Sequence, residues 1–196
     1  MDINSRIAQR IRELRAAQGL SLDAMAERCG VSRSNISLIE RGQSSPTATV
    51  LDKLSAGLGV TVASLFEPCA QPAARPSPVA RAAEQPVWTD PASGYLRRNV
   101  SPPLDTPIQL VDVVFPARQR VAYDTGPRPA ETHQQVWMID GEMDLRVGEV
   151  RWHLQRGDCL SMRLDRPIVY ENPTDQPARY LVALVTLPHM PTRRKP

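Results

Sequence analysis

A run of hydrogen-bonding side chains near residue 32 has the chemistry needed to contact a polyanion. Ser32, Arg33, Ser34 and Asn35 stand together without an acidic residue among them. Hydroxyl, guanidinium and amide groups bind base edges and phosphates. A structural surface helix more often carries an acid in its first turn, since carboxylates suit the positive helix end. The run therefore favours a helix whose N-terminal end faces nucleic acid.

Metal-binding and catalytic chemistry has far fewer candidate residues. The chain has three cysteines and three histidines, scattered without a CxxC pair. Such a set argues against a disulfide framework and a structural zinc site. No Ser-His-Asp or Cys-His grouping stands out, so neither a catalytic site nor a cofactor is predicted.

The elements that must position the polar run are short helices. Apolar residues at helical spacing, beginning with Ile3, Ile7, Ile11 and Leu14, predict the first one. Capping residues separate the others. The predicted caps are Ser21, Ser32, Thr47 and Thr61 at helix starts and Gly19, Gly30 and Gly42 at helix ends. Five short helices are thus expected within residues 1–66. The second and third have helix-turn-helix spacing around Gly30-Val31-Ser32.

The stretch from Gly19 to Phe66 resembles the lambda-repressor-like, Xre-type helix-turn-helix family. The matching motifs are GVS at 30–32, IERG at 39–42, Pro46 and LGV at 58–60. The resemblance implies a DNA-binding domain, with Arg15 and Glu40 forming an ion pair between the first and third helices. It further implies contacts to base edges and phosphates from Ser32, Arg33, Ser34, Asn35, Ser37, Leu38 and Arg41. Leu38 could touch only an apolar edge such as a thymine methyl.

Proline usage divides the chain. Residues 67–87 hold five prolines and six alanines, which predicts a semi-rigid extended linker. Residues 88–190 alternate aliphatic runs with turn residues, which predicts an all-β domain. Within it, 134–147 reads as a hairpin turning at Asp140-Gly141, and a second Gly-containing turn follows at Gly148-Glu149. Residues 191–196 form a basic tail.

The second domain resembles a cupin, a small double-sheet β-barrel. The resemblance rests on Gly141, Gly157-Asp158, Pro167 and Asn172-Pro173. At the family's metal-ligand positions, however, Ile168 replaces a histidine and Gln134 replaces a glutamate. The two upstream histidines would lie within 128–131, where none is present. A mononuclear site needs more N and O ligands than remain, so the barrel is predicted to be metal-free.

A barrel without metal could still hold a small ligand. Alternation places Gln134, Val136 and Met138 on one strand face. The predicted pocket comprises Arg118, Tyr123, Gln134, Val136, Met138, Ile168 and Tyr170. An inward arginine would favour a carboxylate or phosphate ligand. The alternative is that the apolar members fill a closed core.

The favoured hypothesis is a dimeric transcriptional regulator that binds a double-stranded DNA operator and senses a small effector in its barrel. A metal-dependent cupin enzyme with an accessory helix-turn-helix is the alternative, and an antitoxin-like interaction protein is a third possibility. The composition agrees with a globular protein, with 41% hydrophobic and 23% charged residues and a net charge of +3. No apolar run is long enough to span a membrane and no signal peptide is recognisable, so a cytoplasmic location is expected.

Overall fold

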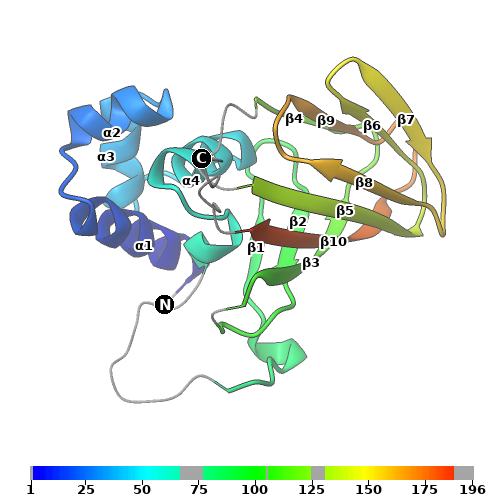
Figure 1. The fold of residues 1–196 in the computed structure, drawn as a ribbon, viewed down its shortest axis with the longest axis horizontal. Coiled ribbons are helices and arrows are strands. Elements are labelled where there is room, and N and C mark those ends of the chain that lie inside the picture. The colour runs from blue at the N-terminus through cyan, green and yellow to red at the C-terminus, as the bar shows by residue number, and fades with distance from the viewer. Residues whose placement is uncertain (1, 67–76, 105, 125–130, 188–196) are drawn as a thin grey trace, which may run out of the picture.

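The computed structural model describes residues 2–66, 77–104, 106–124 and 131–187. Helices make up the N-terminal part (Figure 1). They are α1 (Ile3–Ala17), α2 (Leu22–Cys29), α3 (Arg33–Glu40), α4 (Ala48–Leu58) and the 3₁₀ helix η1 (Ala63–Phe66). No helix in the described parts of the chain is long and apolar enough to cross a membrane.

The predicted caps define these helices. The side chains of Ser21, Ser32 and Thr47 each accept a hydrogen bond from a backbone N–H in the first turn of the following helix. Gly30 ends α2 in the left-handed conformation, as predicted, at φ of 63°. Gly59, which the sequence analysis did not name as a cap, ends α4 in the same way at φ of 69°. The predicted fifth α-helix is instead the single turn η1, in which Thr61 Oγ1 accepts from Ser64 N at 3.2 Å.

The C-terminal part is a barrel of two antiparallel sheets, described here as the first and the second sheet. The first has the order β1-β2-β3-β10-β5-β8 and the second the order β4-β9-β6-β7. The strands are β1 (Val87–Thr89), β2 (Leu96–Asn99), β3 (Ile108–Phe115), β4 (Arg120–Tyr123), β5 (Glu131–Asp140), β6 (Met143–Val147), β7 (Val150–Leu154), β8 (Cys159–Arg163), β9 (Ile168–Glu171) and β10 (Ala178–Leu187). A second 3₁₀ turn, η2 (Ala82–Glu84), precedes β1.

One predicted hairpin is wrong. β5 pairs with β10 and β8, whereas β6 pairs with β7 and β9, so the turn at Asp140-Gly141 carries the chain from the first sheet to the second. Gly141 is required there, because its φ is 75° and an added Cβ would lie 2.9 Å from Ala178 Cα. The hairpin predicted at Gly148-Glu149 is confirmed, with Val147 opposite Val150.

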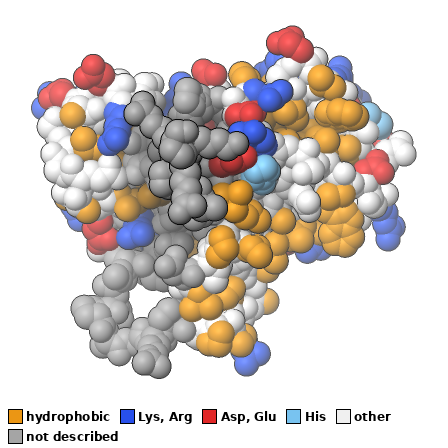
Figure 2. Space-filling model, in the orientation of Figure 1, with side chains coloured by type: hydrophobic (Ala, Val, Ile, Leu, Met, Phe, Trp, Pro, Cys, Tyr) orange, Lys and Arg blue, Asp and Glu red, His pale blue; other side chains and the backbone are white. Residues whose placement is uncertain are grey.

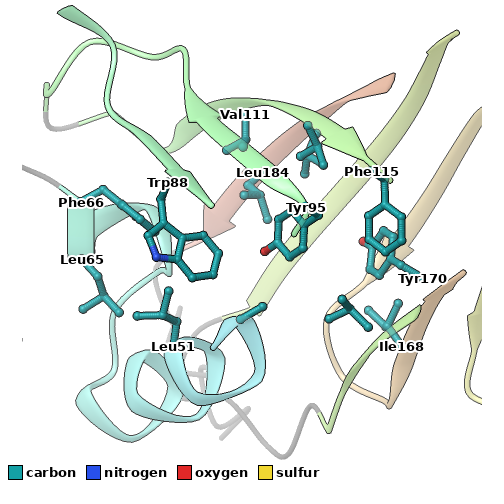
Figure 3. Close-up of a cluster of buried hydrophobic side chains, with 14 of the residues drawn as sticks. Leu51, Leu65, Phe66, Trp88, Tyr95, Val111, Phe115, Ile168, Tyr170 and Leu184 are labelled. Atoms are coloured by element: carbon teal, nitrogen blue, oxygen red, sulfur yellow. The ribbon is translucent and has the colours of Figure 1, made fainter. Parts of the chain in front are cut away.

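The helical domain packs directly on one end of the barrel. Phe66 of η1 meets the Trp88 ring edge-on at 5.9 Å, and Trp88 meets Tyr95 in the same way at 5.8 Å. Figure 3 shows this apolar cluster continuing from Leu51 and Leu65 into the barrel at Phe115 and Ile168. The two domains therefore share one hydrophobic core.

Polar contacts fix the same junction. The buried carboxylate of Asp90, just after β1, accepts a hydrogen bond from Ala48 N at 2.9 Å, at the N-terminus of α4. Thr49 Oγ1 donates to Ala122 O at 3.1 Å, and Asn99 Nδ2 donates to Ala63 O at 3.3 Å. A carboxylate at the positive end of a helix is favourable. These contacts, together with the shared core, hold α4 against the barrel. Residues 67–76 of the predicted linker and the basic tail lie outside the described residues.

Candidate nucleic-acid interface and barrel cavity

The polar run identified in the sequence forms the exposed start of α3. Ser32 caps the helix by accepting from Asn35 N at 3.3 Å. The first turn of α3 has no acidic residue. Ser32, Arg33 and Ser34 are exposed, and Asn35 is partly so. The start of α3 therefore offers donors to a ligand and has no carboxylate within its own first turn to repel phosphate.

The remaining predicted contact residues extend the same surface. Leu38 is 39% exposed on the outer side of α3. Arg41 is exposed beyond the helix end, with Nε donating to Ser37 O at 3.2 Å. The recognition surface is defined here as Ser32, Arg33, Ser34, Asn35, Ser37, Leu38 and Arg41. Contact with DNA by each of these residues stays a prediction.

Arg33 is loosely held in the free protein. Its Nε lies 3.3 Å from Asp23 Oδ1 of α2, and the two side chains are 65% and 75% exposed. Such an exposed pair contributes about 0–1 kcal/mol. A phosphate or guanine edge could therefore replace Asp23 at little cost.

The recognition helix is fixed from behind by the predicted ion pair. Arg15 Nε and Nη2 donate to the two carboxylate oxygens of Glu40 at 2.7 and 2.8 Å, and Arg15 Nη1 donates to Leu20 O at 2.8 Å. Hydrogen bonding to Glu40 raises the pKa of Arg15. The bidentate geometry sets the orientation of α3 relative to α1.

The barrel holds a cavity of about 80 Å³ at its junction with the helices. Four residues of the predicted pocket line it: Tyr123, Gln134, Ile168 and Tyr170. Val136 and Met138 share the inward face of β5 with Gln134 but are packed in the core, at 0% and 1% exposure, and do not line the cavity. These two positions follow the closed-core alternative.

Arg118 is wrongly predicted as a pocket residue. It is exposed at a left-handed backbone position with φ of 58°, and its Nε donates to Asp175 Oδ1 at 2.8 Å. The cavity arginine is Arg97 of β2, which the sequence analysis did not single out. Asp52, Thr61 and Val62 of the helical domain also line the cavity and were not predicted.

Tyr95, Tyr123, Tyr170 and Tyr180 contribute polar groups to the cavity wall. The hydroxyls of Tyr95 and Tyr123 are 3.0 Å apart, and Gln134 Nε2 donates to the Tyr170 hydroxyl. Tyr170 stacks on Tyr180 at 6.0 Å. Burial raises the pKa of each of these tyrosines. They are neutral hydrogen-bonding groups at physiological pH.

Metal-ligand chemistry has little support at this site. Ile168, which the sequence resemblance to cupins aligned with a histidine, is buried and lines the cavity. In the part of the chain that the structure describes, no group of three or more His, Cys, Asp or Glu residues could hold a metal ion. His133 lies on the face of β5 opposite Gln134 and contacts Glu131 at 3.0 Å.

Comparison with known proteins identifies similar chains. Residues 11–65 match the helix-turn-helix family model HTH_3. The HTH-type transcriptional regulator SutR of Escherichia coli (strain K12) is 26% identical over 87% of this chain and 89% of its own length. The HTH-type transcriptional regulator SinR of Bacillus subtilis (strain 168) is 44% identical over 62 residues, 31% of this chain and 56% of its own.

One solved structure shares the whole two-domain arrangement. It is an HTH_3 family transcriptional regulator from Vibrio cholerae, 24% identical, with a TM-score of 0.75 over 95% of this chain and 98% of its own. At that identity the likeness concerns the fold. It agrees with the helical domain and two-sheet barrel described above.

Proposed function

We propose that this chain, an Xre-type helix-turn-helix protein with a C-terminal cupin barrel, is a transcriptional regulator that binds an operator in double-stranded DNA. The observation that carries the proposal is the recognition surface, an exposed helix start with donors and no acid, held by the Arg15–Glu40 pair. The match of residues 11–65 to a helix-turn-helix family and the similarity to named regulators support it. Direct base readout would come from Arg33 and Asn35.

We propose that the working form is a homodimer. A single helix-turn-helix makes a small interface, and such domains gain specificity by binding two half-sites about one helical turn apart. The outer face of the first sheet supports this, because Ile108, Val114, Trp137 and Leu187 are 36–53% exposed there. Figure 2 shows hydrophobic side chains gathered where β3, β5 and β10 face the viewer. Exposed apolar patches of this kind mark interaction surfaces.

We further propose that the barrel controls DNA binding through a small effector and performs no catalysis. The cavity supports this because its wall includes residues of both domains. Ile168 at a metal-ligand position supports a metal-free site. A cytoplasmic location fits such a regulator.

Selection from a library of random DNA duplexes with the full-length protein tests the DNA-binding proposal. We expect a two-fold symmetric sequence to be enriched and bound by two chains per duplex. Arg33→Ala should weaken binding about 5- to 150-fold, and Arg41→Ala should lower the salt slope by about one. Arg156→Ala, which removes the same charge from an exposed loop before β8, is the matched control. Enrichment of no sequence, or equal affinity of Arg33→Ala and Arg156→Ala, would overturn the proposal.

A further inference from the structure

Arg97 is an inward-facing cation with unsatisfied donors. It lies on β2 opposite Trp88 and Val113, both of which are buried. Its Nε and Nη2 atoms are enclosed and have no hydrogen-bond partner among the residues that the structure describes. The guanidinium carbon lies 5.7 Å from the centre of the Phe66 ring, so one face of the group is covered by an aromatic side chain. Enclosed charged donors without partners are costly and rare in folded proteins.

Among the described residues, the polar side chains that line the cavity leave Arg97 Nε and Nη2 unpaired. The other polar groups of the cavity include the tyrosine hydroxyls and Gln134. The hydroxyls of Tyr95 and Tyr123 bond to each other, and Gln134 bonds to the Tyr170 hydroxyl. Asp52 of α4 is the acid among the lining residues, yet it does not satisfy Arg97 Nε or Nη2. The rest of the lining is mostly apolar, including Val113 and Phe115. An anionic ligand with an apolar body would complement this arrangement.

We infer that the cavity binds a small carboxylate whose acidic group pairs with the guanidinium of Arg97, which lines the cavity. A planar guanidinium can present two N–H donors to the two oxygens of a carboxylate. The cavity volume is about 80 Å³. One enclosed water needs about 10–15 Å³ of volume measured in the same way, so a compact ligand with a short aliphatic or aromatic body fits better than a nucleotide. The inference rests on the proposed effector function and gives its chemical class.

The position of the cavity also explains how a bound ligand would affect the DNA-binding domain. Ala48 and Asp52 of α4, with Thr61 and Val62 before η1, form one side of the cavity, and strands of both sheets form the other. A carboxylate held by Arg97 would therefore contact the two domains at once. Because a ligand favours the arrangement that it binds best, it would stabilise the docked position of α4.

Thermal unfolding of the full-length protein with matched probes tests the inference. The probes are 3-methylbutanoate, its neutral isostere 3-methylbutanamide, and the carboxylates acetate and benzoate, each titrated through the millimolar range. At saturation a fitting carboxylate should raise the Tm by about 3 °C. The amide should leave it unchanged. Equal shifts with 3-methylbutanoate and its amide, or no shift with any of the three carboxylates, would overturn the inference.

Variants at position 97 separate a binding arginine from a structural one. Arg97→Met should abolish the carboxylate shift, and its own Tm without ligand should be equal to or above that of the wild type, because two unpaired donors are removed. Arg98→Met is the control for the carboxylate shift alone, since Arg98 lies on the same strand, faces the other side of the sheet and does not line the cavity. Arg97→Lys keeps the charge and should retain a weakened shift. A carboxylate shift that survives in Arg97→Met would contradict the inference.

These measurements contain no DNA, so they fail separately from the proposed function. A carboxylate shift without selective DNA binding would leave the ligand site standing and remove the regulator proposal. Selective DNA binding without a carboxylate shift would support the regulator proposal and remove the ligand site.

Discussion

The recognition surface and the barrel cavity are built in opposite ways. The recognition surface comes from residues 32–41, which are nearly contiguous and lie on α3 and its flanks. The cavity is lined by residues from α4, β2, β3, β4, β5, β9 and β10 and from the segment before η1. The first site exists once one helix is in place. The second exists only when the two domains have docked.

Their two arginines show what this difference means energetically. The Arg33 side chain is 65% exposed and hydrated in the free protein, so it costs little until DNA displaces its water. Two donor atoms of Arg97 are enclosed, so their lost hydration is a cost that the folded protein carries before any ligand arrives. Exposed charges suit a surface that must scan many DNA sequences, and an enclosed charge suits selection of one small anion.

Glu40→Gln should have the largest effect and tests whether the recognition surface is held locally. The change leaves the Arg15 guanidinium, only 18% exposed, without its charged partner. Breaking a buried ion pair by removing one partner costs about 3 kcal/mol or more. Chemical denaturation of the full-length protein measures this loss. Glu27→Gln on the exposed side of α2 is the control and should change the free energy of unfolding by less than about 0.5 kcal/mol.

The same variant links the two sites. Because α4 forms a wall of the cavity, loosening the helical domain should also weaken the response to carboxylate probes. A loss below about 1 kcal/mol would mean that the Arg15–Glu40 pair is not needed to position α3.

The N-terminal domain could be predicted from sequence because its signals are local. Caps such as Ser21, Ser32 and Gly30 lie beside the helices that they delimit, and the Arg15–Glu40 pair followed from a resemblance over the same stretch. The barrel strands β3, β7 and β10 also follow from β-rich runs. Turn residues, however, report only a change of direction. The Asp140-Gly141 turn could not reveal that β5 and β6 belong to different sheets.

The cavity was predicted only in part for a related reason. Gln134, Ile168 and Tyr170 followed from the cupin resemblance and strand alternation. Arg118 was chosen for its nearness to β5 in sequence, but it lies in an exposed turn beside Asp175. Arg97 could be found only by knowing that β2 pairs with β3 and that α4 closes the barrel end. Strand pairing and domain docking decide which residues lie at these positions, and such long-range contacts could not be inferred from one sequence.

Asp90→Asn tests the docking on which the cavity depends. Asp90 Oδ1 accepts from Ala48 N at 2.9 Å, and Oδ2 accepts from Ser93 N and Oγ at 2.9 and 2.6 Å. Loss of a capping carboxylate with buried partners should cost about 1–2 kcal/mol. In a background with Trp137→Phe and Trp152→Phe, the remaining Trp88 reports the junction, since it packs between Phe66 and Tyr95.

We expect the emission of Trp88 to shift to longer wavelength in Asp90→Asn as water reaches the junction. Asp140→Asn, an exposed substitution at the end of β5, should leave the spectrum unchanged. The affinity of either variant for a DNA duplex that contains a single half-site should change little, because the recognition surface lies outside the junction. An unchanged Trp88 spectrum together with unchanged stability in Asp90→Asn would show that the shared apolar core alone holds the domains.

Asp23→Asn should have the smallest effect and examines the recognition surface alone. Removing the carboxylate 3.3 Å from Arg33 Nε frees the guanidinium and deletes one negative charge beside the proposed DNA. Since the exposed pair contributes less than about 1 kcal/mol, operator affinity should rise about 2- to 5-fold while the free energy of unfolding stays the same. Glu27→Gln removes an equal charge from α2 without contacting Arg33, so it isolates the long-range electrostatic part. A fall in affinity on Asp23→Asn would mean that Asp23 positions Arg33 for contact, and that this arginine is preorganised in the free protein as Arg97 is.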